Sequence, residues 1–376
     1  MKMKERLIMR VLTGAAVLSL MLWLTYNCRA GEFTGGTLIF RGTSDASAAV
    51  AVGEDKIIVA DDENNILRVY TINKGGLPVF SYDLTDFLEV EPEYPEADIE
   101  GATKIGDRIY WITSHGRNKD GKLRPNRYRF FATAISTEND TLRIYPVGIA
   151  CKTLVHQLIQ LPLMRNLSLD KATGFSRKTL KGKELERLAP KNEGLNIEAL
   201  SASADGNTIY IGFRNPRPIA GPNRTPHALI VPLKNPAAVV ESGASAVFGE
   251  PILCDFGGLG IRSMEYSSFQ KMYFIVAGHH DEDPHFALYR WSGKTDEQPV
   301  LVRRLSFETN NFTPEALVPF ANSSKLLILS DDGTIPVKVS DKSECADGEL
   351  TANGFCPNKF LTNPNKKTFR GVWIEP

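Results

Sequence analysis

The 376-residue chain is poor in the features that would place it in several common protein classes. It has neither a Gly-x-Ser-x-Gly elbow nor a dinucleotide-binding glycine fingerprint, which excludes an α/β-hydrolase and a Rossmann enzyme. Gly293-Lys-Thr lacks the earlier glycine of a phosphate loop. Basic and acidic residues are equal at 44 each, so the positive excess needed for nucleic-acid binding is missing.

Long apolar runs are also scarce, and the main one lies at the N-terminus. Basic residues between Lys2 and Arg10 precede an apolar stretch from Val11 to Leu24, and Cys28-Arg29-Ala30 resembles a cleavage site. This pattern predicts a signal peptide over residues 1–30 and a periplasmic or secreted protein. A lipoprotein anchor at Cys28 is the less favoured alternative, and no later segment approaches the length of a membrane span. Cleavage would leave a slightly acidic chain.

Cysteine is rare, with five residues in the whole chain. The four after Cys28 match no zinc-binding spacing. In an exported protein they can form disulfides, and Cys345 and Cys356 bracket a loop rich in glycine and asparagine. We therefore predict a Cys345–Cys356 bridge. The pairing of Cys151 and Cys254 is left open, because Cys254 lies in an apolar run and fits a buried thiol.

Short segments that repeat one another indicate a radial β architecture. Each has a polar residue at one fixed place and opens an alternating apolar run followed by a turn and a second β-prone run. The segments are Asp98-Ile-Glu-Gly-Ala, Asn196-Ile-Glu-Ala-Leu, Gly260-Ile-Arg-Ser-Met and Thr313-Pro-Glu-Ala-Leu, with a degenerate copy at Asp45-Ala-Ser-Ala-Ala. Such repetition is typical of a β-propeller, in which every repeat directs one side chain to a common axis. A two-sheet sandwich is the less favoured all-β alternative.

The intervals between repeats predict a single propeller domain over residues 31–376. The interval from Glu100 to Glu198, at 98 residues, could hold an extra blade, but residues 150–195 show helical spacing of apolar residues. We predict five blades and a short helical insertion, with six blades as the alternative. The β-prone segments 37–41 and 368–374 would complete one blade between them and close the ring.

Four further motifs resemble an uncharacterised family of exported bacterial β-propeller proteins that is grouped near the phytase-like propellers. They are Ser114-His-Gly-Arg, Gly212-Phe-Arg-Asn-Pro, the run from Phe248 to Glu265, and Leu288-Tyr-Arg-Trp-Ser-Gly. The resemblance spans most of the mature chain and implies a propeller fold without implying an activity. The metal-binding motifs of phytases have no match, so no phytase residue is transferred.

The propeller alignment predicts two polar rings on one face. In each repeat the polar residue starts a strand and the next strand returns antiparallel, so its end reaches the same face. The inner ring consists of Ser47, Glu100, Glu198, Arg262 and Glu315. The outer ring consists of Asp61, Asp62, His115, Arg117, Arg214, Asn215, His279, His280, Asp331 and Asp332.

The two polar rings allow two interpretations, one functional and one structural. In the functional reading, Glu100, Glu198 and Glu315, with Asp331, hold Ca²⁺ or activate water, and Arg262 sets their charge. In the structural reading, the same carboxylates and Arg262 form an ion-pair network that keeps the blades in register. The segment from His279 to His285 contains metal-ligand residues without regular spacing, which is also typical of an exposed loop.

A basic rim around the rings predicts an anionic small molecule as the ligand. Arg117, Arg127, Arg214 and Asn215 are the expected contacts, together with Arg262, because guanidinium groups suit phosphate and carboxylate. His115 or His279 would protonate a leaving group in an ester or phosphoester hydrolase. The alternative is a non-catalytic binding or scaffolding propeller. A protein partner cannot be identified from these residues, and nucleic acid and a membrane span are not expected.

Overall fold

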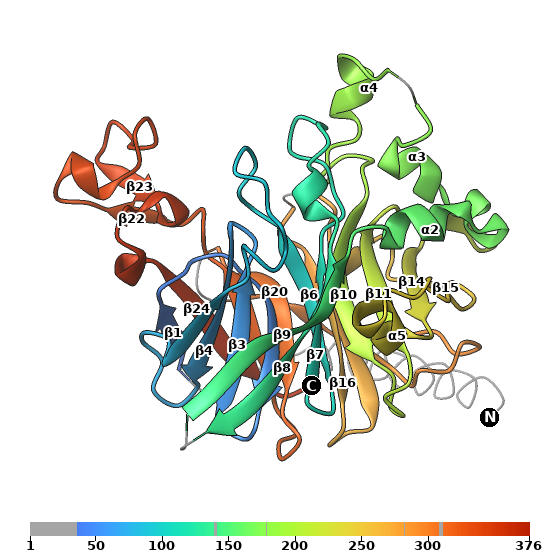
Figure 1. The fold of residues 1–376 in the computed structure, drawn as a ribbon, viewed down its shortest axis with the longest axis horizontal. Helices are drawn as coiled ribbons and strands as arrows, with labels where there is room; N and C mark the ends of the chain where they lie inside the picture. The colour runs from blue at the N-terminus through green and yellow to red at the C-terminus, as the bar shows by residue number, and fades with distance from the viewer. Residues whose placement is uncertain (1–35, 139–140, 178, 282, 308–310) are drawn as a thin grey trace, which may run out of the picture. The chain divides into compact units, whose positions relative to one another are not determined.

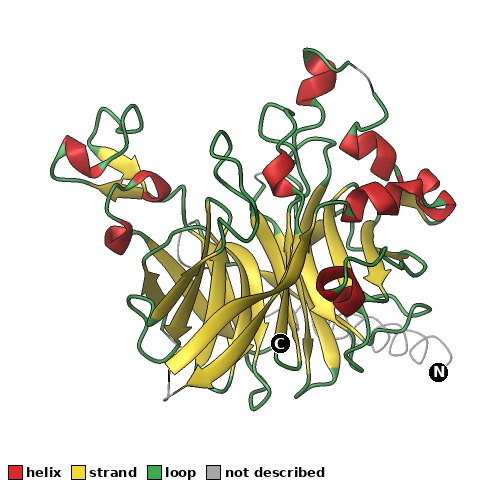
Figure 2. Ribbon diagram, in the orientation of Figure 1, coloured by secondary structure: helices red, strands yellow, loops and turns green. Residues whose placement is uncertain are grey.

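The computed structural model describes residues 36–376 except 139–140, 178, 282 and 308–310, and it consists mainly of β-strands. The predicted signal peptide and Cys28 lie outside the described residues. Five four-stranded antiparallel sheets form the blades of a propeller, with the strands making the ring and the helices lying outside it (Figure 2). In the described part of the chain, no helix is long and apolar enough to cross a membrane.

Each of the first four blades contains four strands that follow one another in chain order. Blade 1 is β2 (Ala46–Val52), β3 (Lys56–Asp61), β4 (Asn64–Thr71) and β5 (Phe80–Asp83). Blade 2 is β6 (Ile99–Ile105), β7 (Arg108–Thr113), β8 (Phe130–Glu138) and β9 (Thr141–Cys151). Blade 3 is β10 (Asn196–Ala202), β11 (Ile209–Asn215), β14 (Ala228–Leu233) and β15 (Ile252–Cys254). Blade 4 is β16 (Gly260–Ser267), β17 (Met272–Gly278), β18 (Phe286–Trp291) and β19 (Val300–Leu305).

The fifth blade joins the two ends of the propeller. It consists of β20 (Thr313–Pro319), β21 (Leu326–Asp331), β24 (Thr368–Ile374) and β1 (Leu38–Arg41). The N-terminal strand β1 pairs antiparallel with β24, with Leu38 opposite Gly371. Figure 1 shows the earliest and latest colours of the chain side by side in this blade. The predicted five-bladed propeller and its closure by the two terminal strands are therefore confirmed, and six blades and a sandwich are excluded.

A β-bulge recurs at the same place in all five innermost strands, β2, β6, β10, β16 and β20. In each of these strands the pairing with the next strand skips one residue. The skipped residues are Ser47, Glu100, Glu198, Arg262 and Glu315. A bulge leaves its extra residue out of the ladder and re-aims its side chain. The five inner-ring positions are thus the positions that the backbone releases from strand pairing.

Hydrophobic layers between neighbouring blades hold the ring together. Strand residues on both faces of a blade are buried, because each blade packs against a blade on either side. Trp111 and Phe131 of blade 2 pack with blade 1, whereas Ile112 and Phe130 pack with blade 3. This alternation fixes the register of each strand, since a slip by one residue would exchange the two faces.

Short helices occupy the long connection between blades 2 and 3. They are α2 (Leu154–Gln160), α3 (Leu169–Thr173) and α4 (Lys183–Glu186), with the 3-10 turn η2 (Pro162–Leu167). Leu154, Val155 and Leu158 are buried against the blade 2 and blade 3 core, which explains the helical spacing of apolar residues in the sequence. In Figure 1 these helices rise from one end of the ring. Other short elements between the blade strands are α5 (Pro236–Glu241), the hairpin β12 (Ile219–Ala220) and β13 (Thr225–Pro226), and the 3-10 turn η1 (Pro125–Arg127).

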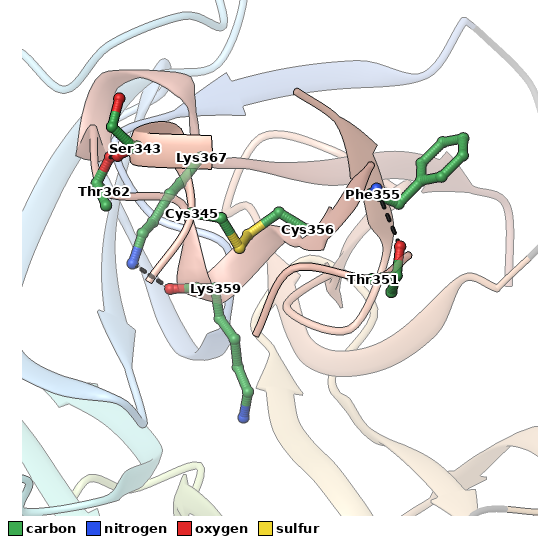
Figure 3. The surroundings of a disulfide bond; sticks show 8 residues. All are labelled: Ser343, Cys345, Thr351, Phe355, Cys356, Lys359, Thr362 and Lys367. Carbon is green, nitrogen blue, oxygen red and sulfur yellow. Dashed lines mark hydrogen bonds between the residues drawn. A yellow bond between two sulfur atoms is a disulfide. The ribbon is translucent and has the colours of Figure 1, made fainter. Parts of the chain in front are cut away.

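A second insertion lies between β21 and β24 and contains the predicted disulfide. It comprises β22 (Pro336–Lys338), β23 (Phe355–Pro357) and the 3-10 turns η3 (Lys342–Glu344), η4 (Asn358–Phe360) and η5 (Pro364–Lys366). Cys345 and Cys356 are bonded, as predicted, and are largely enclosed (Figure 3). The disulfide is compatible with an exported protein. Cys151 and Cys254 are free, buried thiols.

Candidate functional site

A polar cavity of about 890 Å³ lies where the five bulged residues converge. Ser47, Glu100, Glu198, Arg262 and Glu315 all line it. The other acidic residues of its wall are Asp45, Asp62, Glu63, Glu96, Asp98, Asp281, Asp283 and Asp331. Its other basic residues are Arg117, Lys119, Arg127, Lys191, Arg214 and Lys359. Both insertions contribute to the wall, the helical one through residues 189–192 and the disulfide-bonded one through Lys359.

Two arginines and two glutamates are paired on one side of the cavity. Glu198, which is 3% exposed, accepts a hydrogen bond of 2.7 Å from Arg214 Nη1, and its other oxygen lies 3.2 Å from Arg262 Nε. Arg262 also pairs with Glu315. Burial and the nearby Arg214 lower the pKa of Arg262 to about 10, so the group stays protonated at neutral pH. This side of the cavity is close to electrically balanced.

Three carboxylates form a second group in the cavity wall, and among the described residues only one of them, Asp98, has an ion-pair partner. Asp62 follows β3, Asp98 precedes β6, and Glu100 is the bulged residue of β6. One oxygen from each lies within 4.8 Å of the other two. Burial and neighbouring carboxylates raise the pKa of Asp62 and of Glu100 well above the ordinary range. In the described part of the chain no ion pair joins Asp62 or Glu100 to a basic residue.

Two further acids extend this carboxylate cluster. Asp45 and Asp331 form an isolated backbone bridge beside Asp62, and both raise its pKa. Burial and Asp331 raise the pKa of Asp45 itself to about 8. The negative charge of the cluster is partly neutralised by Arg127, whose Nη1 lies 3.0 Å from Asp98 Oδ2. The cluster could hold a hard cation, because such ions take several carboxylate oxygens at once.

The structure places His115 away from the cavity. Its side chain is fully buried, Nδ1 lies 2.9 Å from the carbonyl oxygen of Thr113, and the ring packs edge-on against Tyr128. Burial lowers the pKa of His115 to about 4, so the imidazole is neutral at physiological pH. The expected role as a proton donor to a ligand is therefore corrected, because the strand end at which His115 stands turns into the interior.

Two residues of the expected anion-binding rim instead fasten the helical insertion. Arg117 donates two hydrogen bonds of 3.0 Å to the carbonyl oxygen of Thr173. Asn215 donates to the carbonyl oxygens of Pro190 and Asn192 at 2.9 and 3.1 Å. Arg117 nevertheless lines the cavity, whereas Asn215 does not, so a ligand contact by Arg117 stays a prediction.

The other predicted residues divide between the cavity and its surroundings. Arg127 pairs with Glu96 and Asp98 in the cavity wall. Of the outer ring, Asp62, Arg214 and Asp331 line the cavity. Asp61 accepts a hydrogen bond from Thr43, and Asp332 pairs with Arg370, so both stabilise loops. His279 and His280 lie in the loop after β17, beside Asp281 at the cavity rim.

Four wall residues were missed by the sequence reasoning although a signal for them was present. Asp45, Asp98, Asn196 and Thr313 each stand two residues before an inner-ring position. They are the first residues of the repeated segments, and four of the five first residues are polar. Polarity at the first residue of a segment is therefore the signal for these positions, whereas the bulge at the third residue cannot be seen in the sequence.

Comparisons with known proteins provide a family match for one part of the chain. Residues 45–142, which span blade 1 and most of blade 2, match DUF3616, a family described as a protein of unknown function. The match agrees with the expected uncharacterised family. The proposed grouping near phytase-like propellers stays a prediction. No curated protein is detectably similar in sequence.

Solved structures are similar to the chain at low identity. Glutaminyl cyclase from Myxococcus xanthus is 8% identical over 79% of this chain and 90% of its own, with a TM-score of 0.40. A luciferin-regenerating enzyme is 5% identical over 90% and 95%, with a TM-score of 0.39. The β-propeller domain of Cps50 (Swd1) from Myceliophteria thermophila is 8% identical over 77% and 94%, with a TM-score of 0.33. We draw no conclusion about function from these distant neighbours.

Proposed function

We propose that the protein binds a Ca²⁺ ion through Asp62, Asp98 and Glu100 and uses it to bind a small anionic molecule in the central cavity. The observation that carries the proposal is the spacing of the three carboxylates. Oxygens that share one Ca²⁺ lie at most about 5 Å apart, because each bond is about 2.3–2.6 Å long. The three oxygens lie within 4.8 Å of one another, which fits that limit.

The charge of the cluster supports a cation on independent grounds. Buried carboxylates at this spacing repel one another, and a bound cation would stabilise their ionised forms. One oxygen of Asp62 is buried and has no hydrogen-bond partner among the described residues. An unsatisfied buried oxygen costs free energy unless something binds it. A divalent cation in the cluster would satisfy it.

The ligand would bind to the cation rather than to the arginines alone. Arg214 and Arg262 are already paired with Glu198 and Glu315, so they offer little net positive charge. Three carboxylates occupy only part of the six to eight positions around Ca²⁺, which leaves positions for phosphate or carboxylate oxygens. The cavity volume of about 890 Å³ suits a small molecule.

Hydrolysis of an ester or phosphoester is the reaction that such a site would support, since a bound cation polarises the carbonyl or phosphoryl oxygen and so favours attack of water on the adjoining carbon or phosphorus. Binding without turnover is the second candidate, and a specific observation favours it. One oxygen of Glu198 accepts two hydrogen bonds and the other is paired with Arg262, and His115 does not line the cavity. Two of the expected acid–base residues, Glu198 and His115, therefore make contacts within the protein instead of facing a ligand.

Calorimetric titration with Ca²⁺ tests the proposal, using chelator-treated protein, the double variant Asp62→Asn/Glu100→Gln, and Asp283→Asn as the matched control. Asp283 lines the same cavity outside the cluster. We expect one Ca²⁺ per chain in the wild type and in the control and none in the double variant. Equal binding by all three proteins would refute the site.

A screen of phosphate and carboxylic esters, with and without chelator, then separates the two candidates. Chelator-sensitive turnover identifies an enzyme, and Ca²⁺-dependent binding without turnover identifies a binding protein. Ligand binding that is unchanged by chelator would contradict the role given to the cation.

A further inference from the structure

The loop between β17 and β18 brings two histidines and an aspartate together at the rim of the cavity. His279, His280 and Asp281 follow directly after β17 and each offers one ligand atom, with all three atoms within 4.8 Å of one another. Asp281 also lines the central cavity. Imidazole nitrogens and a carboxylate oxygen form a donor set that suits zinc and related transition metals better than Ca²⁺.

The separation of one pair in this group is that of two metal ligands rather than that of a hydrogen bond. His279 Nδ1 lies 3.4 Å from Asp281 Oδ1, which is longer than the 2.7–3.2 Å or so of a good N–H···O bond. Two ligands bound tetrahedrally to one zinc at about 2.0–2.1 Å lie about 3.3–3.4 Å apart. The observed separation matches this edge of a tetrahedron.

Both imidazoles also leave a nitrogen unused. Nδ1 of His279 and Nδ1 of His280 are buried atoms without a hydrogen-bond partner among the described residues. Buried polar atoms are normally satisfied, so two unsatisfied nitrogens beside one carboxylate call for a partner.

Neighbouring groups hold the aspartate in position. The backbone N–H of Asp283 donates a hydrogen bond of 3.0 Å to Asp281 Oδ1, which orients the carboxylate. Arg214 Nη2 donates a hydrogen bond of 2.9 Å to the carbonyl oxygen of Asp281. The same arginine pairs with Glu198 in the cavity wall, so the loop is tied to the blade 3 side of the site. Such supporting contacts are typical around metal ligands.

We infer that His279, His280 and Asp281 form a binding site for a transition-metal ion of the zinc type. Three protein ligands leave the fourth tetrahedral position for water or a ligand atom from the cavity. The site does not depend on the proposed Ca²⁺ site, because the two share no ligand and differ in donor type.

The test is titration of tag-free, chelator-treated protein with Zn²⁺, followed by calorimetry and by metal analysis after gel filtration. The test variant is His279→Ala/His280→Ala, and the control is His156→Ala, which removes an exposed histidine of the helical insertion. We expect one tightly bound Zn²⁺ in the wild type and in the control, and loss of that ion in the double variant.

Asp281→Asn supplies a second variant, which keeps an oxygen that can accept the hydrogen bond from the Asp283 N–H. It should weaken Zn²⁺ binding at least tenfold. Unchanged stoichiometry and affinity in both test variants, or no Zn²⁺ binding by the wild type, would overturn the inference. The variant Asp62→Asn/Glu100→Gln should keep its Zn²⁺, so failure of the calcium proposal and failure of the zinc site give different results.

Discussion

Removing the carboxylate of Glu198 should destabilise the propeller strongly, because this side chain neutralises two buried guanidinium groups. It is 3% exposed and accepts hydrogen bonds of 2.7 Å from both Arg214 and Asn196. Arg262 lies on its other oxygen at 3.2 Å. Glu198→Ala leaves the guanidinium groups of Arg214 and Arg262 and the side-chain amide of Asn196 without this partner, next to the space that the carboxylate filled. Breaking a buried ion pair by removing one partner costs about 3–5 kcal/mol.

Equilibrium unfolding in urea at pH 7 measures this cost. We expect Glu198→Ala to lower the free energy of unfolding by about 3–5 kcal/mol, and Glu198→Gln to lower it less because the amide keeps one accepting oxygen in place. Ca²⁺ binding should persist in Glu198→Gln, since Glu198 lies outside the proposed cation ligands. A loss below about 1 kcal/mol for Glu198→Ala would refute the structural role of the pair.

Two further predictions concern groups outside the cation sites. Burial raises the pKa of the Glu265 carboxyl from 4.5 to about 8. Between these two pH values the folded protein keeps a proton that the unfolded chain releases, so the free energy of unfolding should fall by about 3–5 kcal/mol as the pH rises from 4.5 to 8. Glu265→Gln should remove that part of the pH dependence in unfolding titrations, and an unchanged slope would contradict it. The double variant Cys345→Ala/Cys356→Ala removes a disulfide between residues 11 apart, which stabilises the folded insertion by about 3 kcal/mol. Limited proteolysis within residues 346–355 should therefore be on the order of 100-fold faster in the variant. Equal cleavage of the variant and the wild type would show that other contacts hold the insertion.

The fold was largely predictable because its signals are local and repeated. The polar position that recurs in five segments marks the innermost strand of each blade, and the β-prone ends of the chain predict closure through β1 and β24. The disulfide could also be predicted, since only a short loop separates Cys345 and Cys356. The details of the two insertions could not, because their short helices depend on packing against the blades rather than on intrinsic propensity.

The site was predictable in position but not in pairing. The sequence places Glu100, Glu198, Arg262 and Glu315 around one axis, and the structure brings all four to one cavity. The sequence could not indicate that Arg262 pairs with Glu198 and Glu315 while Glu100 lies near Asp62. That division depends on side-chain directions at the bulges. The burial of His115 could not be predicted either, because the residue after a strand can turn into the interior as easily as toward a cavity.

The most direct test of the account is the position of a hard cation in crystals grown with Mn²⁺, which substitutes for Ca²⁺ at oxygen sites and gives anomalous scattering. The account predicts one anomalous peak within about 2.6 Å of carboxylate oxygens from Asp62, Asp98 and Glu100. Well-ordered crystals with Mn²⁺ present and no peak among these three side chains would contradict the central claim.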